Sequence, residues 1–467
     1  MPLDRLSAQD VTFLHLERPH QPMHAGSLLV FDEEPFFAEG RFRLDEVRAT
    51  IANRLHLAPR LRRRLLTVPL RQGRPIWVDD EHFDIAYHVR LTALPRPGSH
   101  DQLCALMGRL QMQPLNRDRP LWELWFVEGV AHGRIAVIQK THQALVDDGT
   151  PMDVVNLLLD LDREPDDVGA PFWDPEPAPT GAELLGRSLV ERVTVPAELA
   201  SGIRTALQTP RHLAEQSVSA ARSFVDFGRK APGLPWNQPM SNRRRYDLVK
   251  VDLDRVRRIT DRTGTTVNDV VLAAVTGAMR DLLMAREQPV DGLTLRALVP
   301  LSVDHPRTGM ALGSDIVIEI AELPVGESDP TERLRLVSAD LARRTGEKQA
   351  DGAETLLGLS RYAPPTLLAM AARLISHQRP ANVTVVNVPG PAEARYCMGA
   401  RLLETWPWIG TTDTTGPVVA VVTYDDALWF GLTADRDLVP DLAYLAERIT
   451  AAIDDLSGSD PYSGIGV

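Results

Sequence analysis

The side chains best placed to do chemistry lie between residues 139 and 151, which read Gln-Lys-Thr-His-Gln-Ala-Leu-Val-Asp-Asp-Gly-Thr-Pro. The single histidine of this segment, His142, is followed by Gln143 and then by Asp147 and Asp148. A histidine takes up and releases a proton near neutral pH, so such a segment supports acid–base chemistry where its side chains reach a cleft. We treat it as the candidate functional loop.

A strand and a helix are expected to hold this loop. Residues 134–138 form a short apolar, β-branched run, which is typical of a buried strand. After the loop, Thr150 can cap a helix that begins at Pro151, with Asp153 as its capping-box partner. The apolar face of that helix consists of Val154, Val155, Leu158 and Leu159. His142 is therefore expected at a strand-to-helix junction.

Length and composition limit the classes of protein to consider. A chain of 467 residues is expected to form about two domains of roughly 150 to 200 residues each. With 51 Lys and Arg against 63 Asp and Glu, the net charge is −12, which argues against nucleic acid as a partner. Cys104 and Cys397 lie in different halves and form neither a disulfide framework nor a zinc site, which predicts a reducing compartment.

The N-terminal residues lack the basic and apolar regions of a signal peptide, and no segment has the roughly 18 uninterrupted apolar residues of a membrane span. The sequence thus predicts a cytoplasmic protein, either free or touching membranes from outside. A cluster of arginines follows Pro59 and is interpreted as a solvated face, with contact to a membrane or to phosphate as the alternative. The cluster comprises Arg60, Arg62, Arg63 and Arg64.

Periodicity predicts an α/β fold built from two domains with a cleft between them. We expect a first domain at residues 1–165, a linker with connecting helices at 166–245, and a second domain at 246–467. Strands are predicted at 25–31, 83–91, 134–138, 246–251, 295–299, 316–320, 383–386, 418–423 and 428–432. Helices are predicted at 44–66 with a break at Pro59, and at 99–112, 151–161, 254–263, 266–279 and 442–456. The helix at 266–279 is apolar on nearly every side and is expected in the interior.

Ordered blocks along nearly the whole chain resemble a known family, the bacterial wax ester synthase/diacylglycerol acyltransferases. These enzymes are related to chloramphenicol acetyltransferases (CAT) and to peptide-synthetase condensation domains. The blocks are Pro120-Leu121-Trp122, residues 142–149, Asn268-Asp269 with residues 270–272, residues 299–303, Asn387-Val388-Pro389-Gly390-Pro391, and residues 424–435. Residues 7–13 and Pro22-Met23-His24 also fit the family.

This resemblance implies two CAT-like domains with a tunnel at their interface. It implies acyl-CoA as a substrate, a long-chain alcohol or diacylglycerol as acceptor, no metal or further cofactor, and contact with a membrane or lipid droplet from the cytoplasm. It also implies that several blocks shape the tunnel and its loops, namely Pro120, Leu121, Trp122, Asn387, Pro389 and Gly390. By the same resemblance, Asn268 and Asp269 cap and seat the buried helix.

The family's motif is His-His-x-x-x-Asp-Gly, whose second histidine is the general base that deprotonates the attacking alcohol. Aligned on the aspartate, His142 and Asp147 match, but Gln143 replaces the second histidine and Asp148 the glycine. With Asp148 and Gly149 as the Asp-Gly pair, Ala144 takes the catalytic place. Neither register puts a histidine there. A glutamine amide hydrogen-bonds a hydroxyl or an oxyanion but accepts no proton near pH 7.

Adjacent side chains in an extended segment point to opposite faces. If Gln143 faces the tunnel, His142 faces the protein and supports the loop. A rebuilt loop in which His142 supplies the base is the alternative. Asp147 and Asp148 are interpreted as loop anchors or helix-dipole partners. The chain also departs from the family at Gly313-Ser314-Asp315, where Gly-Asn is usual.

Two functions follow from these residues. The first is an O-acyltransferase for wax ester or triacylglycerol synthesis, with an activity weakened by Gln143. The second is a family member without that activity, which binds an acyl chain or a partner protein or uses the tunnel for another reaction. The preserved blocks favour the first function, and Gln143 favours the second.

Overall fold

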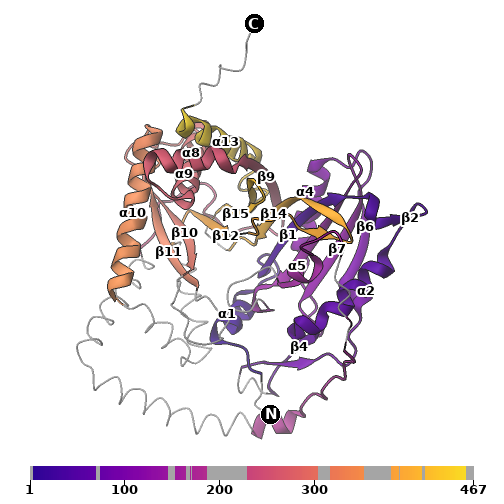
Figure 1. The fold of residues 1–467 in the computed structure, drawn as a ribbon. Coiled ribbons are helices and arrows are strands. Elements are labelled where there is room, and N and C mark those ends of the chain that lie inside the picture. Colours follow the sequence, from indigo (N-terminus) through magenta and orange to yellow (C-terminus); the bar gives the residue numbers. More distant parts are fainter. Residues whose placement is uncertain are drawn as a thin grey trace.

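The computed structural model describes residues 4–69, 74–145, 153–164, 169, 171–186, 229–302, 316–351, 380–388, 390–412 and 416–458. Within these ranges the chain forms two six-stranded sheets, each with its own helices and its own apolar core (Figure 1). The α/β class predicted from the sequence is confirmed.

The first sheet has the strand order β13-β14-β1-β8-β7-β6. Its strands are β1 (His24–Asp32), β6 (Val89–Ala93), β7 (Trp122–Val130), β8 (Arg134–His142), β13 (Tyr396–Cys397) and β14 (Ala400–Ile409). The helices of this half are α1 (Ala8–Leu16), α2 (Leu44–Arg54), α3 (Ile85–His88), α4 (His100–Gln111) and α5 (Asp153–Leu158). All neighbouring strands are antiparallel except β6 and β7. The central strands β1 and β8 are paired so that His24 lies opposite His142.

The second sheet has the order β11-β10-β12-β15-β16-β9 and is parallel at β10–β12 and β12–β15. Its strands are β9 (Arg244–Asp252), β10 (Leu295–Ser302), β11 (Ile316–Leu323), β12 (Val383–Val388), β15 (Val418–Tyr424) and β16 (Ala427–Asp435). Its helices are α8 (Leu253–Thr263), α9 (Val267–Ala285), α10 (Pro330–Asp351) and α13 (Leu442–Ser457). Every residue of α9 from Val270 to Met279 is buried, as its all-round apolar sequence predicts.

Strand β14 links the two halves. It follows β12 in the chain, yet it lies in the first sheet between β13 and β1. Sequence patterning did not predict this strand. It contains Pro407, a residue that usually marks an edge or an irregular position, and its main partner β1 lies far away in the sequence.

Aromatic side chains pack where β14 meets the second sheet. The Tyr246 hydroxyl donates to the Pro407 carbonyl at 2.8 Å, and the Tyr246 ring lies 5.0 Å from that of Trp408. The Trp406 and Trp429 rings meet edge to face at 4.7 Å. At Gly431 the two backbones come so close that a Cβ atom would lie 1.9 Å from the Pro407 oxygen. The junction is therefore packed too closely to accept a side chain at residue 431.

Gly431→Ala is expected to lower the free energy of unfolding by about 1 to 3 kcal/mol, because overpacking forces backbone to shift. Urea unfolding followed by tryptophan fluorescence measures the change. Gly233→Ala is the matched control, since a Cβ at Gly233 meets nothing within 4 Å. Equal unfolding midpoints for the two variants would contradict the close approach.

Two local predictions are wrong. The strand predicted at 83–91 begins with α3, because the Asp84 side chain accepts the Ala86 N–H at 2.9 Å and caps a helical turn before β6. The helix predicted at 44–66 ends at Arg54. Two 3₁₀ turns, Leu55–Leu57 and Pro59–Arg62, then lead into strand β4 (Arg63–Leu66), which pairs with β5 (Ile76–Asp79). Pairing with a distant strand overrode the helical pattern.

The arginine cluster after Pro59 is not a simple solvated face. Arg63 donates to Asp79 at 3.1 Å and to Asp4 at 2.7 Å. Arg62 is buried, and its guanidinium lies 4.9 Å from the centre of the Trp173 ring. These side chains fasten the N-terminal segment and the proline-rich segment around Trp173 to the first half of the structure.

Candidate active site

His142 ends β8, and its backbone N–H and ring Nδ1 are hydrogen-bonded to protein groups. Its side chain is 1% exposed, and its backbone N–H donates to the Leu121 carbonyl at 3.0 Å. Its Nδ1 accepts the Ala144 N–H at 3.0 Å. A neutral ring therefore carries its proton on Nε2, which lies 3.6 Å from the Glu17 carboxylate. Both ring nitrogens of His142 face the protein.

Glu17, the residue that caps the C-terminus of α1, lies between two histidines. Its Oε1 is 3.6 Å from His142 Nε2 and 3.8 Å from His24 Nε2, and its Oε2 accepts from Arg117 at 2.5 Å. Burial alone would raise the pKa of Glu17, but the hydrogen bonds and charges of His142 and Arg117 outweigh it and lower the pKa to about 2. Glu17 is thus a stable anion between His142 and His24.

His24, the cross-strand neighbour of His142, is also fixed. The two ring centroids are 6.1 Å apart, and His24 Nδ1 donates to the Gln111 carbonyl at 2.8 Å. Burial, together with the positive charge of Lys140, lowers the pKa of His24 to about 3. A histidine with so low a pKa remains neutral and is a poor acceptor for the proton of an alcohol at pH 7.

Gln143 differs from its neighbour. It begins the 3₁₀ turn Gln143–Leu145 and is half-buried, whereas His142 is fully buried. Its backbone N–H donates to the Met23 carbonyl at 2.8 Å, which fixes the turn against the start of β1. Asp147, Asp148 and Gly149, together with the predicted cap Thr150 and Pro151, lie outside the described residues.

The Pro120-Leu121-Trp122 block packs directly behind His142. The carbonyl of Leu121 accepts the His142 N–H. Trp122 is fully buried, donates from Nε1 to the Leu61 carbonyl at 2.8 Å, and stacks on His88 at 4.5 Å. These contacts position the strand end from which the loop departs.

Asn268 and Asp269 lie at the start of α9, in the half of the structure built on the second sheet. Thr266 and Asp269 form a reciprocal capping box, and the Asp269 carboxylate also accepts the Ser338 hydroxyl of α10 at 3.1 Å. Asn268 is half-buried. The hydrogen bonds of Asp269 therefore join two helices of the second half, rather than reaching His142.

The Asn387-to-Gly390 block leaves the second sheet. Asn387 lies on β12 opposite Val421 of β15 and is half-buried. A Cβ at Gly390 would lie 2.0 Å from the Thr423 oxygen, so this position admits only glycine without a backbone shift. Pro389 and Gly313-Ser314-Asp315 are outside the described residues.

Sequence reasoning missed several charged and polar groups of this region. Lys140 lies two residues before His142 and is 1% exposed; its Nζ donates to the Gln113 carbonyl. Burial lowers the pKa of Lys140 to about 8. A signal for His24 existed, because its Pro-Met-His block fits the family. Glu17 carried no local signal, since its contact with His142 joins residues far apart in the chain.

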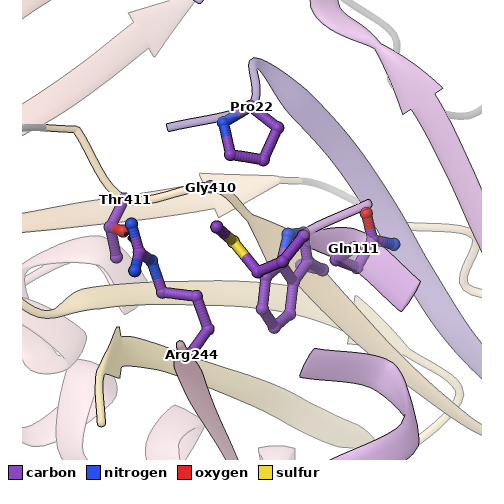
Figure 2. Close-up of a pocket in the computed structure, with 7 residues that line it drawn as sticks. Pro22, Gln111, Arg244, Gly410 and Thr411 are labelled. Atoms are coloured by element: carbon purple, nitrogen blue, oxygen red, sulfur yellow. Dashed lines mark hydrogen bonds between the residues drawn. The ribbon is translucent and has the colours of Figure 1, made fainter. Parts of the chain in front are cut away.

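A small cavity lies beside this cluster at the junction of the two halves (Figure 2). It is narrow, with essentially no space for a water molecule, and is lined by Pro22, Gln111, Met112, Arg244, Trp408, Gly410 and Thr411. The described residues contain no group of His, Cys, Asp or Glu side chains arranged to hold a metal ion. Among the helices of the same residues, none combines the length and apolarity needed to span a bilayer.

Comparison with known proteins gives a consistent picture. Residues 6–271 match the wax ester synthase/diacylglycerol acyltransferase catalytic domain, and residues 312–457 match the C-terminal domain of the same family. The chain is 31% identical over 465 residues to tgs1 of Mycobacterium tuberculosis H37Rv, which is named a probable diacylglycerol O-acyltransferase. The match covers 97% of this chain and 95% of that protein.

Solved structures extend the likeness to the fold. The wax ester synthase/diacylglycerol acyltransferase of Marinobacter aquaeolei VT8 matches 97% of this chain and all of its own, with 27% identity and a TM-score of 0.67. The trichothecene 15-O-acetyltransferase of Fusarium sporotrichioides matches 97% of this chain and 94% of its own, with 13% identity and a TM-score of 0.60. The second likeness concerns the fold alone.

Proposed function

We propose that this chain, which belongs to the wax ester synthase/diacylglycerol acyltransferase family, transfers a fatty acyl group from acyl-CoA to a long-chain alcohol or diacylglycerol. Because both acceptors dissolve poorly in water, the protein meets them at the surface of a membrane or lipid droplet, reached from the cytoplasm. The relatives' names support the reaction class, and the preserved blocks support the same two-domain framework.

The observation that carries the proposal is the match of residues 6–271 and 312–457 to the two domains of the family. The mechanism depends on Gln143. This residue follows the buried His142 at the end of β8, in a turn held to Met23. With the motif aligned on Asp147, Gln143 takes the place of the general base. We propose that the hydroxyl oxygen attacks the thioester carbonyl carbon, that the C–S bond to CoA breaks, and that the departing CoA thiolate takes up the hydroxyl proton. Both substrates are held together, so that positioning supplies much of the acceleration. The Gln143 amide hydrogen-bonds the hydroxyl or the developing oxyanion but takes no proton. Asp147 and Asp148 anchor the loop in this proposal.

Because a general base contributes about 10²- to 10⁴-fold, the native chain is expected to transfer acyl groups slowly. The test is release of CoA from palmitoyl-CoA, followed with a thiol reagent, with hexadecanol or diacylglycerol as acceptor. Omitting the acceptor gives the hydrolysis background. Slow release that depends on the acceptor supports the proposal, and release equal to the background contradicts it.

A second function is favoured by one observation: both ring nitrogens of His142 face protein groups, and His24 is equally enclosed. A chain that lacks a general base can still bind an acyl chain, because binding requires only the fold. If CoA release is absent but palmitoyl-CoA binds with micromolar affinity in isothermal titration, the protein is an acyl-chain binder. Absence of binding as well would contradict both functions.

A further inference from the structure

Arg244, the first residue of β9, makes contacts that the family motif does not account for. Its side chain is 1% exposed and lines the cavity at the junction of the two halves. A buried guanidinium is tolerated only where its donors find acceptors. Arg244 finds them on four chain segments: its own, the end of β16, the segment before β1 and the segment after β14.

On its own side, Arg244 is anchored to the second sheet. It donates to the Ser241 carbonyl at 2.7 Å and lies 3.5 Å from Asp435, at the end of β16. Asp435 is itself buried and fixed, because its carboxylate accepts the backbone N–H groups of Ser241 and Asp437. The guanidinium therefore moves with the second sheet.

On the other side, Arg244 holds the segment that leads into β1. Its Nη2 donates to the His20 carbonyl at 2.5 Å. His20 belongs to a tight turn closed by two backbone hydrogen bonds between Arg18 and Gln21, which makes the turn stiff. Three residues later, the Met23 carbonyl accepts the Gln143 N–H at 2.8 Å. One hydrogen bond thus joins this short segment to Arg244, and another joins it to Gln143.

A second route closes the ring around the cavity. Arg244 Nε donates to the Thr411 hydroxyl at 2.6 Å, and Figure 2 shows the guanidinium turned toward Thr411. Thr411 follows Gly410, whose N–H donates to the His24 carbonyl at 3.3 Å. The segment containing Met23 is therefore held at both ends by groups that Arg244 binds.

We propose that Arg244 is a positioning residue. It couples the position of the second sheet, relative to the first, to the position of Gln143. Movement of the second sheet relative to the first shifts the His20–His24 segment through Arg244, and with it the turn that begins at Gln143. That this coupling serves catalysis rests on the proposed function. The coupling itself is measured without turnover.

The test is hydrogen–deuterium exchange of the full chain, comparing wild type with Arg244→Met and Thr411→Val. Loss of charge-assisted hydrogen bonds is expected to speed exchange in peptides covering residues 139–145 by roughly 10- to 100-fold in Arg244→Met. Thr411→Val removes one acceptor and gives a smaller rise, and Thr411→Ser restores the wild-type rate. Peptides from the interior of α9 are expected to exchange as in wild type.

Two results would overturn the coupling. One is wild-type exchange at residues 139–145 in both Arg244→Met and Thr411→Val. The other is an equal rise in α9, which would mean general destabilisation. If Arg244→Met does not fold, the comparison of Thr411→Val with Thr411→Ser decides. Since no substrate is present, failure of the coupling is distinguishable from failure of acyl transfer.

Discussion

Gln143→His is expected to raise the rate of acyl transfer by about 10²- to 10⁴-fold, which is the usual contribution of a general base. Gln143 is half-buried, whereas the preceding His142 is fully buried, so a side chain at residue 143 is partly exposed at the turn. Neither existing histidine can substitute, because His142 Nδ1 accepts the Ala144 N–H and burial together with Lys140 lowers the pKa of His24 to about 3. The gain is measured as CoA release at saturating palmitoyl-CoA and acceptor.

Gln143→Asn is the matched control, because it keeps an amide and adds no base. It is expected to remain as slow as wild type. The pH profile gives an independent check: the activity of Gln143→His should rise with the deprotonation of a single group near the ordinary pKa of histidine, about 6.5. A histidine variant no faster than the asparagine variant would show that residue 143 is not where the base acts.

Glu17→Gln is expected to lower the free energy of unfolding by about 3 kcal/mol at pH 7. The pKa of Glu17 falls from 4.5 to about 2 because hydrogen bonds and charges from His142 and Arg117 outweigh burial. A carboxyl group whose pKa is lower in the folded state stabilises the fold, and the full stabilisation is present at any pH above the pKa of the unfolded state. This contribution is lost as the pH falls from about 4.5 toward 2. Urea unfolding of both proteins between pH 7 and pH 2.5 measures it.

Glu46→Gln is the control for charge removal, since Glu46 pairs with Arg43 on the surface with 56% of its side chain exposed. Its unfolding midpoint is expected to change little, because solvent screens such pairs. The difference in the free energy of unfolding between wild type and Glu17→Gln should become smaller below pH 4.5. A difference that stays constant with pH, or one no larger than that of Glu46→Gln, would contradict an ionised Glu17 between His142 and His24.

Local periodicity predicted those helices and strands whose own apolar pattern determines their structure. The all-round apolar run at 266–279 is the buried core of α9, and the β-branched run at 134–138 lies in β8. Strand β14 was missed because its place depends on pairing with β1, in which Ser27 lies opposite Pro407 of β14. Such a contact joins residues hundreds of positions apart, and no pattern within β14 encodes it.

The candidate site divides in the same way. Alternation along an extended segment predicted opposite faces for His142 and Gln143. His142 ends a strand but Gln143 begins a 3₁₀ turn, so the different burial of the two side chains does not follow from alternation. The partners of His142 were beyond prediction, because Glu17 reaches it from α1 and Leu121 from the neighbouring strand segment. The role of Arg244 depends on the junction between the two sheets, which exists only after both have folded.

The most direct test of the central claim is the product. Wild type and Gln143→His are incubated with isotopically labelled palmitoyl-CoA and either hexadecanol or diacylglycerol, and the lipids are analysed by mass spectrometry. An acyltransferase whose base is replaced by Gln143 yields labelled wax ester or triacylglycerol slowly in wild type and much faster in the variant. Labelled free palmitate alone, or no labelled lipid from either protein, would contradict it.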